Sequence, residues 1–224
     1  MTMLPYLRPW FAYKMRIAAF LMSLVYLPYL VIGNVTFFHV TALKPSVVDG
    51  MIPFIDTAVW PYLSIYLFMP IAPMVMINRN LLRHYAMGMA SIALLAHLIF
   101  LFWPTTVGRP NPTHANVCYQ FLAVIDPPLN CFPSLHAALT LYSALCCDML
   151  SRTAKNARLL KTLLWAWTAL ILLSTLATKQ HFWIDVAGGA VLGVVVFVCA
   201  FKPIRHLQIR REMIDPTNHQ FNQR

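Results

Sequence analysis

Long apolar runs separated by short polar segments make up most of this 224-residue chain. Three runs in the first half are long enough to cross the roughly 30 Å hydrocarbon core of a bilayer, which takes about 20 residues of helix. Three shorter runs follow. The predicted spans are 17–38, 57–77, 85–104, 135–150, 162–178 and 184–201. They leave no room for a separate soluble domain, so the sequence predicts one all-α membrane domain, residues 1–224, a polytopic protein with six transmembrane helices in one bundle.

The composition agrees with a membrane location. Apolar residues make up 59% of the chain, charged residues 11%, and the mean hydropathy is +0.64, far from the balance of soluble domains. A net charge of +10 could instead indicate a nucleic-acid binder, but fourteen of the 17 Lys and Arg fall in segments that six spans place on one side. The positive-inside rule makes that side cytoplasmic, together with both termini. We therefore predict an integral protein of a bacterial inner (plasma) membrane, with the bilayer and not nucleic acid as its partner.

The basic N-terminal segment and the apolar run after it could also be a cleaved signal peptide. The run is too long for the apolar part of such a peptide, and it contains Pro28. Its removal would also move the C-terminal basic cluster to the other side of the membrane. We therefore expect an uncleaved first helix.

Polar residues gather in two segments at the ends of apolar runs, residues about 105–136 and 178–185. Ionisable side chains at a membrane boundary cost free energy unless they are paired or face water, so such a cluster indicates a functional site. The first segment belongs to the longest connection in the chain, and its prolines make it stiff. It brings Arg109 and His136 to one face, on the periplasmic or outer side of the predicted topology.

The residue types in these segments suit nucleophilic catalysis. His181 and Asp185 are four residues apart and share one face of a helix, so the carboxylate can fix one ring nitrogen and leave the other as a nucleophile. His136 can donate a proton near neutral pH. The sequence shows no carboxylate cluster for a metal, so we predict a metal-independent reaction without a cofactor. Three further residues could bind an anion by charge or by a hydroxyl near a helix N-terminus: Arg109, Lys179 and Ser134.

These motifs resemble the type-2 phosphatidic acid phosphatase superfamily, whose integral-membrane members have a six-helix core. Its pattern is Lys-x6-Arg-Pro, then Pro-Ser-Gly-His, then Ser-Arg-x5-His-x3-Asp. The matching segments are Gly108-Arg109-Pro110, Pro133-Ser134-Leu135-His136 and His181-x3-Asp185. The resemblance implies that His181 takes the phosphoryl group, Asp185 orients it, His136 protonates the leaving group and Arg109 holds phosphate oxygens.

Three positions depart from the hydrolase pattern: Phe102 replaces its Lys, Thr175 replaces its Arg and Leu135 replaces its Gly. Two phosphate-binding cations are therefore missing, and Lys179 is the only obvious replacement. Thr-Lys-Gln-His together with Pro-Ser-Leu-His is more similar to the branch that contains inositol phosphorylceramide synthase and sphingomyelin synthase, which moves a phosphoalcohol head group between lipids.

Two functions on a phosphorylated lipid follow from this resemblance. Both begin with phosphorylation of His181, and they differ in whether water or a second alcohol attacks next. Hydrolysis is the first expectation and head-group transfer the alternative. A transporter is a remote third reading, because the ionisable residues gather at one membrane face instead of spanning it. The sequence does not name the lipid or the oligomeric state.

The cysteines divide by position. Cys118 and Cys131 lie in the long outer loop, where the surroundings would be oxidising, and they could form a disulfide or remain two unpaired thiols. Gly189-x3-Gly193 in the last span is typical of close helix packing. His97, alone within a span, is interpreted as a core residue.

Overall fold

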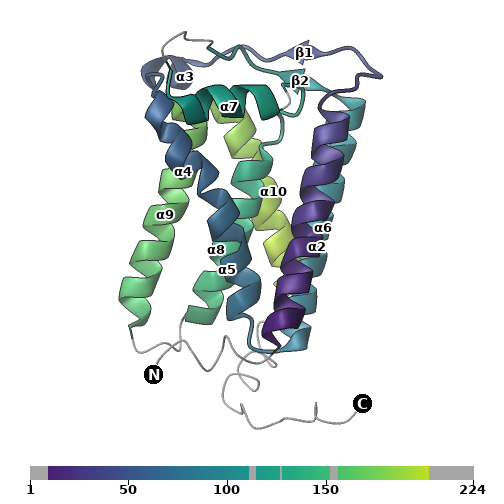
Figure 1. The fold of residues 1–224 in the computed structure, drawn as a ribbon, viewed down its shortest axis with the longest axis vertical. Helices are drawn as coiled ribbons and strands as arrows, with labels where there is room; N and C mark the ends of the chain where they lie inside the picture. The colour runs from purple at the N-terminus through teal and green to yellow at the C-terminus, as the bar shows by residue number, and fades with distance from the viewer. Residues whose placement is uncertain (1–9, 111–114, 127, 152–155, 202–224) are drawn as a thin grey trace.

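The computed structural model describes residues 10–110, 115–126, 128–151 and 156–201. Within these residues, long helices run side by side and alternate in direction, and the short elements gather at one end of the bundle (Figure 1). The long segments are α2 (Phe11–Ile32), α6 (Arg79–Phe102), α8 (Leu135–Ser151), α9 (Ala157–Ala177), α10 (Trp183–Phe201) and a bent segment formed by η1 (Asp56–Ala58), α4 (Val59–Leu63) and α5 (Ile65–Val75).

The structure confirms an all-α polytopic membrane protein. Among the described residues, five segments are long and apolar enough to cross a membrane, and α8 is a shorter apolar helix of 17 residues. The first helix begins and ends earlier than the predicted span 17–38. Lys14 lies inside it, buried, and its ammonium donates to the Met74 carbonyl at the end of α5, 2.9 Å away. This bond lets a charged residue join the helix ahead of the apolar run.

Close contact between α8 and α10 fixes the centre of the bundle. A side chain at Gly189 would place its Cβ 2.2 Å from the Ser134 carbonyl oxygen, and one at Gly193 would place it 2.5 Å from that of Ala138. The two glycines therefore let the helix backbones touch, which supports the packing interpretation of the Gly-x3-Gly pair. As a result, the first turns of α8 and α10 lie next to each other.

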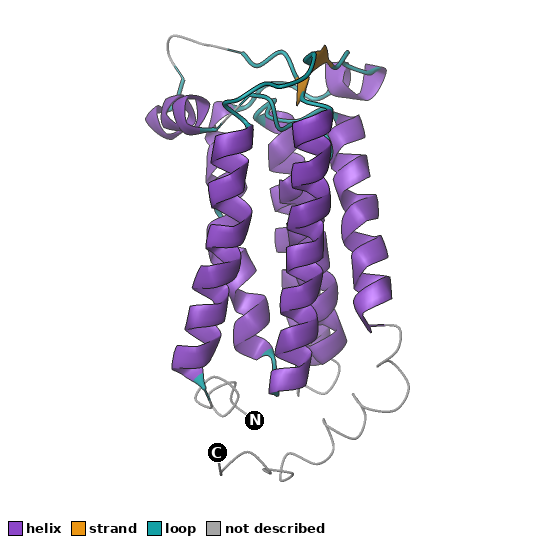
Figure 2. Cartoon of the chain, turned by 90° about the vertical axis from the view of Figure 1, so that its right-hand side faces the viewer, coloured by secondary structure: helices purple, strands orange, loops and turns teal. Residues whose placement is uncertain are grey.

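The connections at one end form a cap over the bundle, seen from the side in Figure 2. The short helices α3 (Val47–Met51) and α7 (Val117–Ile125) belong to it. So do β1 (Thr41–Ala42) and β2 (Thr105–Thr106), which pair in parallel and join the two long connections. The turn between α9 and α10 lies at the same end. The opposite end carries the starts of three long helices and their basic residues, Lys14, Arg16, Arg79, Arg83, Arg158 and Lys161.

Candidate active site

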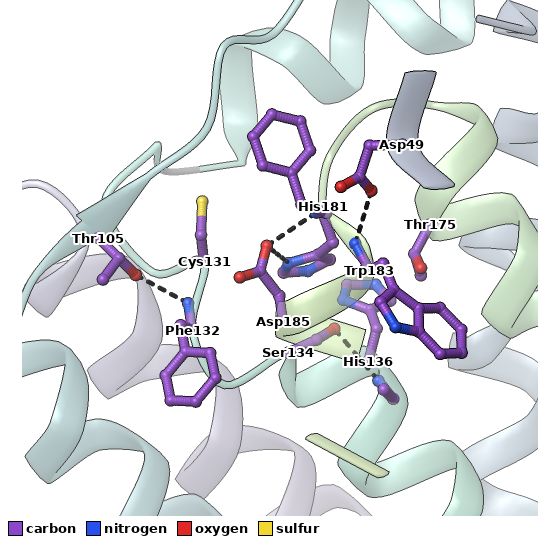
Figure 3. Close-up of polar contacts among 12 residues, drawn as sticks. Asp49, Thr105, Cys131, Phe132, Ser134, His136, Thr175, His181, Trp183 and Asp185 are labelled. Atoms are coloured by element: carbon purple, nitrogen blue, oxygen red, sulfur yellow. Dashed lines mark hydrogen bonds and ion pairs between the residues drawn. The ribbon is translucent and has the colours of Figure 1, made fainter. Parts of the chain in front are cut away.

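His181 lies in the turn before α10, and its ring lies beside the carboxylate of Asp185 (Figure 3). Its Nδ1 is 3.7 Å from Asp185 Oδ2, which is ion-pair range and longer than a hydrogen bond. The same Oδ2 accepts a 2.8 Å hydrogen bond from the Phe182 backbone N–H, and the Asp185 side chain is fully buried. The carboxylate is thus fixed behind Nδ1. This leaves Nε2 as the nitrogen that can react.

His136 lies in the first turn of α8, beside His181. Its ring stacks on Tyr62 with centroids 4.1 Å apart, and the Tyr62 hydroxyl is 3.4 Å from His136 Nδ1. In the tautomer in which Tyr62 donates to Nδ1, His136 Nε2 carries the proton that a general acid needs. The centroids of the two imidazole rings are 6.1 Å apart. One phosphoryl group between them could therefore contact both rings.

Arg109 is held by Asp126, a residue that sequence reasoning did not place in the site. Its Nη2 is 3.1 Å from Asp126 Oδ2, and its Nη1 donates to the Asp126 carbonyl at 2.9 Å. The Tyr29 hydroxyl donates to Asp126 Oδ1 at 2.6 Å, so the carboxylate connects Arg109 to α2. Burial lowers the pKa of the Arg109 guanidinium, but the negative charge of Asp126 raises it by more, so the pKa is raised overall. Arg109 therefore stays cationic in a fixed place.

Ser134 ties the two helix starts together. Its hydroxyl accepts a 3.3 Å bond from the Ala137 N–H in the first turn of α8, and its own N–H donates to the Asp185 carbonyl at 3.0 Å. The side chain is fully buried. Ser134 thus supports the geometry around Asp185, and its expected contact with phosphate stays a prediction.

The Lys179 ammonium is engaged with the cap. It donates to the Asp49 carbonyl at 2.7 Å and also to the Ile52 carbonyl. The backbone of Lys179 has φ 55°, in the left-handed region, which turns the chain between α9 and α10. The structure thus joins Lys179 to α3, and its predicted role as a phosphate ligand remains a prediction.

Cys118 and Cys131 are free thiols, so the possible disulfide is not present in this structure. The two residues belong to different clusters, Cys118 with Tyr62 and Tyr119, and Cys131 with Val107 and Phe182. The pKa of Cys131 is raised to about 12, chiefly by burial. The charge of Arg109 lowers this pKa, and the charges of Asp185 and Asp126 raise it. This protonated thiol therefore lies close enough to Arg109 and to the two carboxylates for their charges to act on it.

Asp49 of α3 was not identified from the sequence, yet it connects the cap to the histidine turn. Its Oδ1 accepts a 2.7 Å bond from the Trp183 N–H at the start of α10, 134 residues away (Figure 3). Its Oδ2 accepts from the N–H and hydroxyl of Ser46, both at 2.7 Å, in a capping box. The spacing of Ser46 and Asp49 could have indicated a helix start. It could not have indicated the contact with α10.

Burial raises the pKa of the Asp49 carboxyl, but hydrogen bonds from Ser46 and Trp183 outweigh this effect, so the pKa is lowered. A carboxyl whose pKa is lower in the folded than in the unfolded protein adds stability above its unfolded pKa, and this stability is lost as the pH falls through the folded value. The contact between α3 and α10 is therefore expected to persist throughout the neutral range.

Replacing Asp49 with alanine should loosen the histidine turn. The Trp183 and Ser46 N–H groups would lose their acceptor, at a cost of about 1–3 kcal/mol in the free energy of unfolding, and turnover should fall about tenfold because His181 is less well placed. Thermal unfolding and initial rates would be measured together. Asp148→Ala is the matched control, since Asp148 pairs with Lys161 at the far end of the bundle. Wild-type stability and rate in Asp49→Ala would contradict this role.

Among the described residues, several buried polar side-chain atoms without a hydrogen-bond partner lie in the two histidine segments. These include His136 Nε2, His181 Nδ1, Asp185 Oδ1 and both amide atoms of Gln180. Buried polar groups are normally hydrogen-bonded, so this cluster is suited to a polar ligand. The described residues contain no group of three or more His, Cys, Asp or Glu that could hold a metal ion.

A helical membrane bundle that places two buried histidines side by side, one of them backed by a carboxylate, has the features of an enzyme for group transfer. The model of the PAP2 superfamily matches residues 81–207, more than half of the chain, and the chain belongs to this superfamily. The resemblance drawn from the motifs is thereby confirmed at the level of the superfamily. Its members are phosphatases or phosphotransferases, so the protein is a membrane-embedded enzyme of phosphoryl transfer. Searches of curated proteins and of solved structures gave no match.

Proposed function

We propose that the protein is a lipid phosphatase that hydrolyses a phosphorylated lipid through a phosphohistidine on His181. The observation that carries this proposal is the arrangement of the two imidazole rings, 6.1 Å apart, with the Asp185 carboxylate buried behind His181. One ring has a carboxylate at Nδ1 and the other a tyrosine hydroxyl at Nδ1. The two histidines thus have different surroundings, as a nucleophile and a general acid require.

In the first step, His181 Nε2 attacks phosphorus while the bond from phosphorus to the lipid oxygen breaks. His136 Nε2 gives its proton to that oxygen, and the lipid alcohol leaves. Asp185 stabilises the positive charge on the His181 ring, and Arg109 stabilises the charge on the phosphoryl oxygens. In the second step, water attacks phosphorus, His136 accepts the water proton, and the bond from phosphorus to nitrogen breaks to release phosphate.

Transfer of a head group between lipids is the second candidate. It is favoured because the two predicted phosphate-binding cations already have partners. Arg109 pairs with Asp126, and the ammonium of Lys179 donates to two backbone carbonyls. A site with little uncompensated positive charge suits a phosphodiester, which carries less negative charge than a phosphate monoester. In this reaction the hydroxyl of a second alcohol replaces water in the second step.

The orientation in the membrane also belongs to the proposal. The described basic residues at the starts of α2, α6 and α9 lie at the end opposite the histidines. The positive-inside rule would place that end in the cytoplasm. The site would then open on the other face, which is the periplasmic face of a bacterial inner membrane.

The test is a product assay on purified protein with a panel of lipid phosphates. We expect free phosphate and the dephosphorylated lipid, resolved by mass spectrometry, and an unchanged rate in the presence of a chelator. A new phospholipid that appears only when an acceptor alcohol is added, without phosphate release, would establish the transferase. Loss of the rate in chelator with recovery in magnesium would contradict a metal-independent reaction.

A further inference from the structure

An apolar cleft runs from the candidate site along the seam between α2 and the α4–α5 segment. It encloses about 50 Å³, and its walls come from α2, α4, α5, α7 and α8. Two polar side chains line it, and both belong to the candidate site or its support: His136 and Asp126. The rest of its lining is aliphatic, methionine or tyrosine. The cleft is therefore amphipathic, with its polar groups in the site.

A second, smaller hollow extends the same seam away from the site. It encloses about 10 Å³ and shares Met22 of α2 and Met69 of α5 with the first. Its other lining residues include Ala18, near the start of α2, and Pro73, near the end of α5, and both of these helix ends lie opposite the histidine end. We call these two hollows and the seam they share the apolar track. Its lining suits a hydrocarbon chain and not a charged head group.

Two tyrosines that line the track are also partly exposed on the surface of the bundle. Tyr26 of α2 and Tyr66 of α5 both line it, and their rings meet edge to face with centroids 6.2 Å apart. Tyr66 is 38% exposed, on a segment that is long and apolar enough to cross a membrane. The molecules that surround such a segment in a bilayer are lipids, so hydrocarbon is the ligand that can reach the track.

We propose that this track binds a hydrocarbon chain of the phosphorylated lipid, with the phosphate at His136 and His181 and the chain between α2 and α5. This inference rests on the proposed function for the identity of the head. Burial of apolar chain surface would supply much of the affinity, and the track would select substrates by chain length. Tyr26 and Tyr66 would lie at the point of entry from the bilayer.

The test compares a short and a long substrate in lipid nanodiscs. Met22→Trp narrows the track, and the matched control is Leu67→Trp, because Leu67 is 69% exposed on α5 and does not line either hollow. We expect Met22→Trp to raise KM for hexadecyl phosphate about tenfold, since displacing roughly two buried methylenes is sufficient. KM for hexyl phosphate should change less than about twofold, and Leu67→Trp should leave both values unchanged.

Binding of hexadecylphosphonate, an unreactive analogue, gives a readout that does not depend on turnover. Its affinity should fall in Met22→Trp and also in Met22→Ala, which removes apolar contact without adding bulk. An unchanged ratio of long-chain to short-chain affinity in both variants would overturn the track. Chain-dependent binding without phosphate release from either alkyl phosphate would retain the track and contradict the phosphatase.

Discussion

Replacing His181 with alanine should lower the rate of phosphate release by at least about 10³-fold, the scale of loss expected when a catalytic nucleophile is removed. His181 is 3% exposed and its Nδ1 faces a buried carboxylate, so no other described side chain has the same arrangement. Alanine leaves the phosphorus without a nucleophile while Arg109 and His136 stay in place. The substrate should therefore still bind, and KM should change much less than kcat.

The control for His181→Ala is His39→Ala. His39 is exposed in the connection between α2 and β1, at the same end of the bundle. Its replacement should leave the rate at the wild-type value. Thermal unfolding of both variants would show whether the mutated chains fold. A folded His181→Ala protein with full turnover would exclude His181 as the nucleophile.

Replacing His136 with asparagine should lower kcat by about 10²–10⁴-fold, the range typical of a lost general acid. The loss should depend on the leaving group. A lipid alcohol needs a proton as it departs, whereas p-nitrophenolate leaves without one. With p-nitrophenyl phosphate the defect of His136→Asn should therefore be much smaller, while the defect of His181→Ala should be equally large with both substrates. Equal losses of His136→Asn with both leaving groups would show that His136 does not act as the acid.

Tyr62→Phe separates the two contacts of Tyr62 with His136. The phenylalanine keeps the ring that stacks at 4.1 Å but removes the hydroxyl near Nδ1. We expect the pH profile of kcat to shift, because the hydroxyl helps to set which ring nitrogen carries the proton.

The helices and the pairing of His181 with Asp185 could be predicted because they depend on local sequence. Apolar runs of membrane length define the bundle. The four-residue spacing of His181 and Asp185 predicts that the ring and the carboxylate meet, and they are 3.7 Å apart although His181 lies in the turn before α10 and not in the helix. The close packing at Gly189 could also be inferred, since small residues four apart let helices touch. These features need no knowledge of distant contacts.

The supporting contacts of the site could not be predicted, because they join residues far apart in the chain. Asp126 reaches Arg109 across a loop, and Asp49 reaches Trp183 across four of the long segments. Lys179 has the charge of a phosphate ligand, but its neighbours are backbone carbonyls, which leave no pattern in a sequence. The pairing of Cys118 and Cys131 likewise depended on a distance that only the fold determines.

The most direct test of the central claim is the capture of the phosphoenzyme. Purified protein would be mixed with ³²P-labelled lipid phosphate, quenched in base within the first turnover and digested, and the labelled peptide would be sequenced by mass spectrometry. We predict an acid-labile, base-stable label on His181 that is absent from His181→Ala. Turnover of the lipid without any label on the protein, or a label on another residue that persists in His181→Ala, would contradict the mechanism.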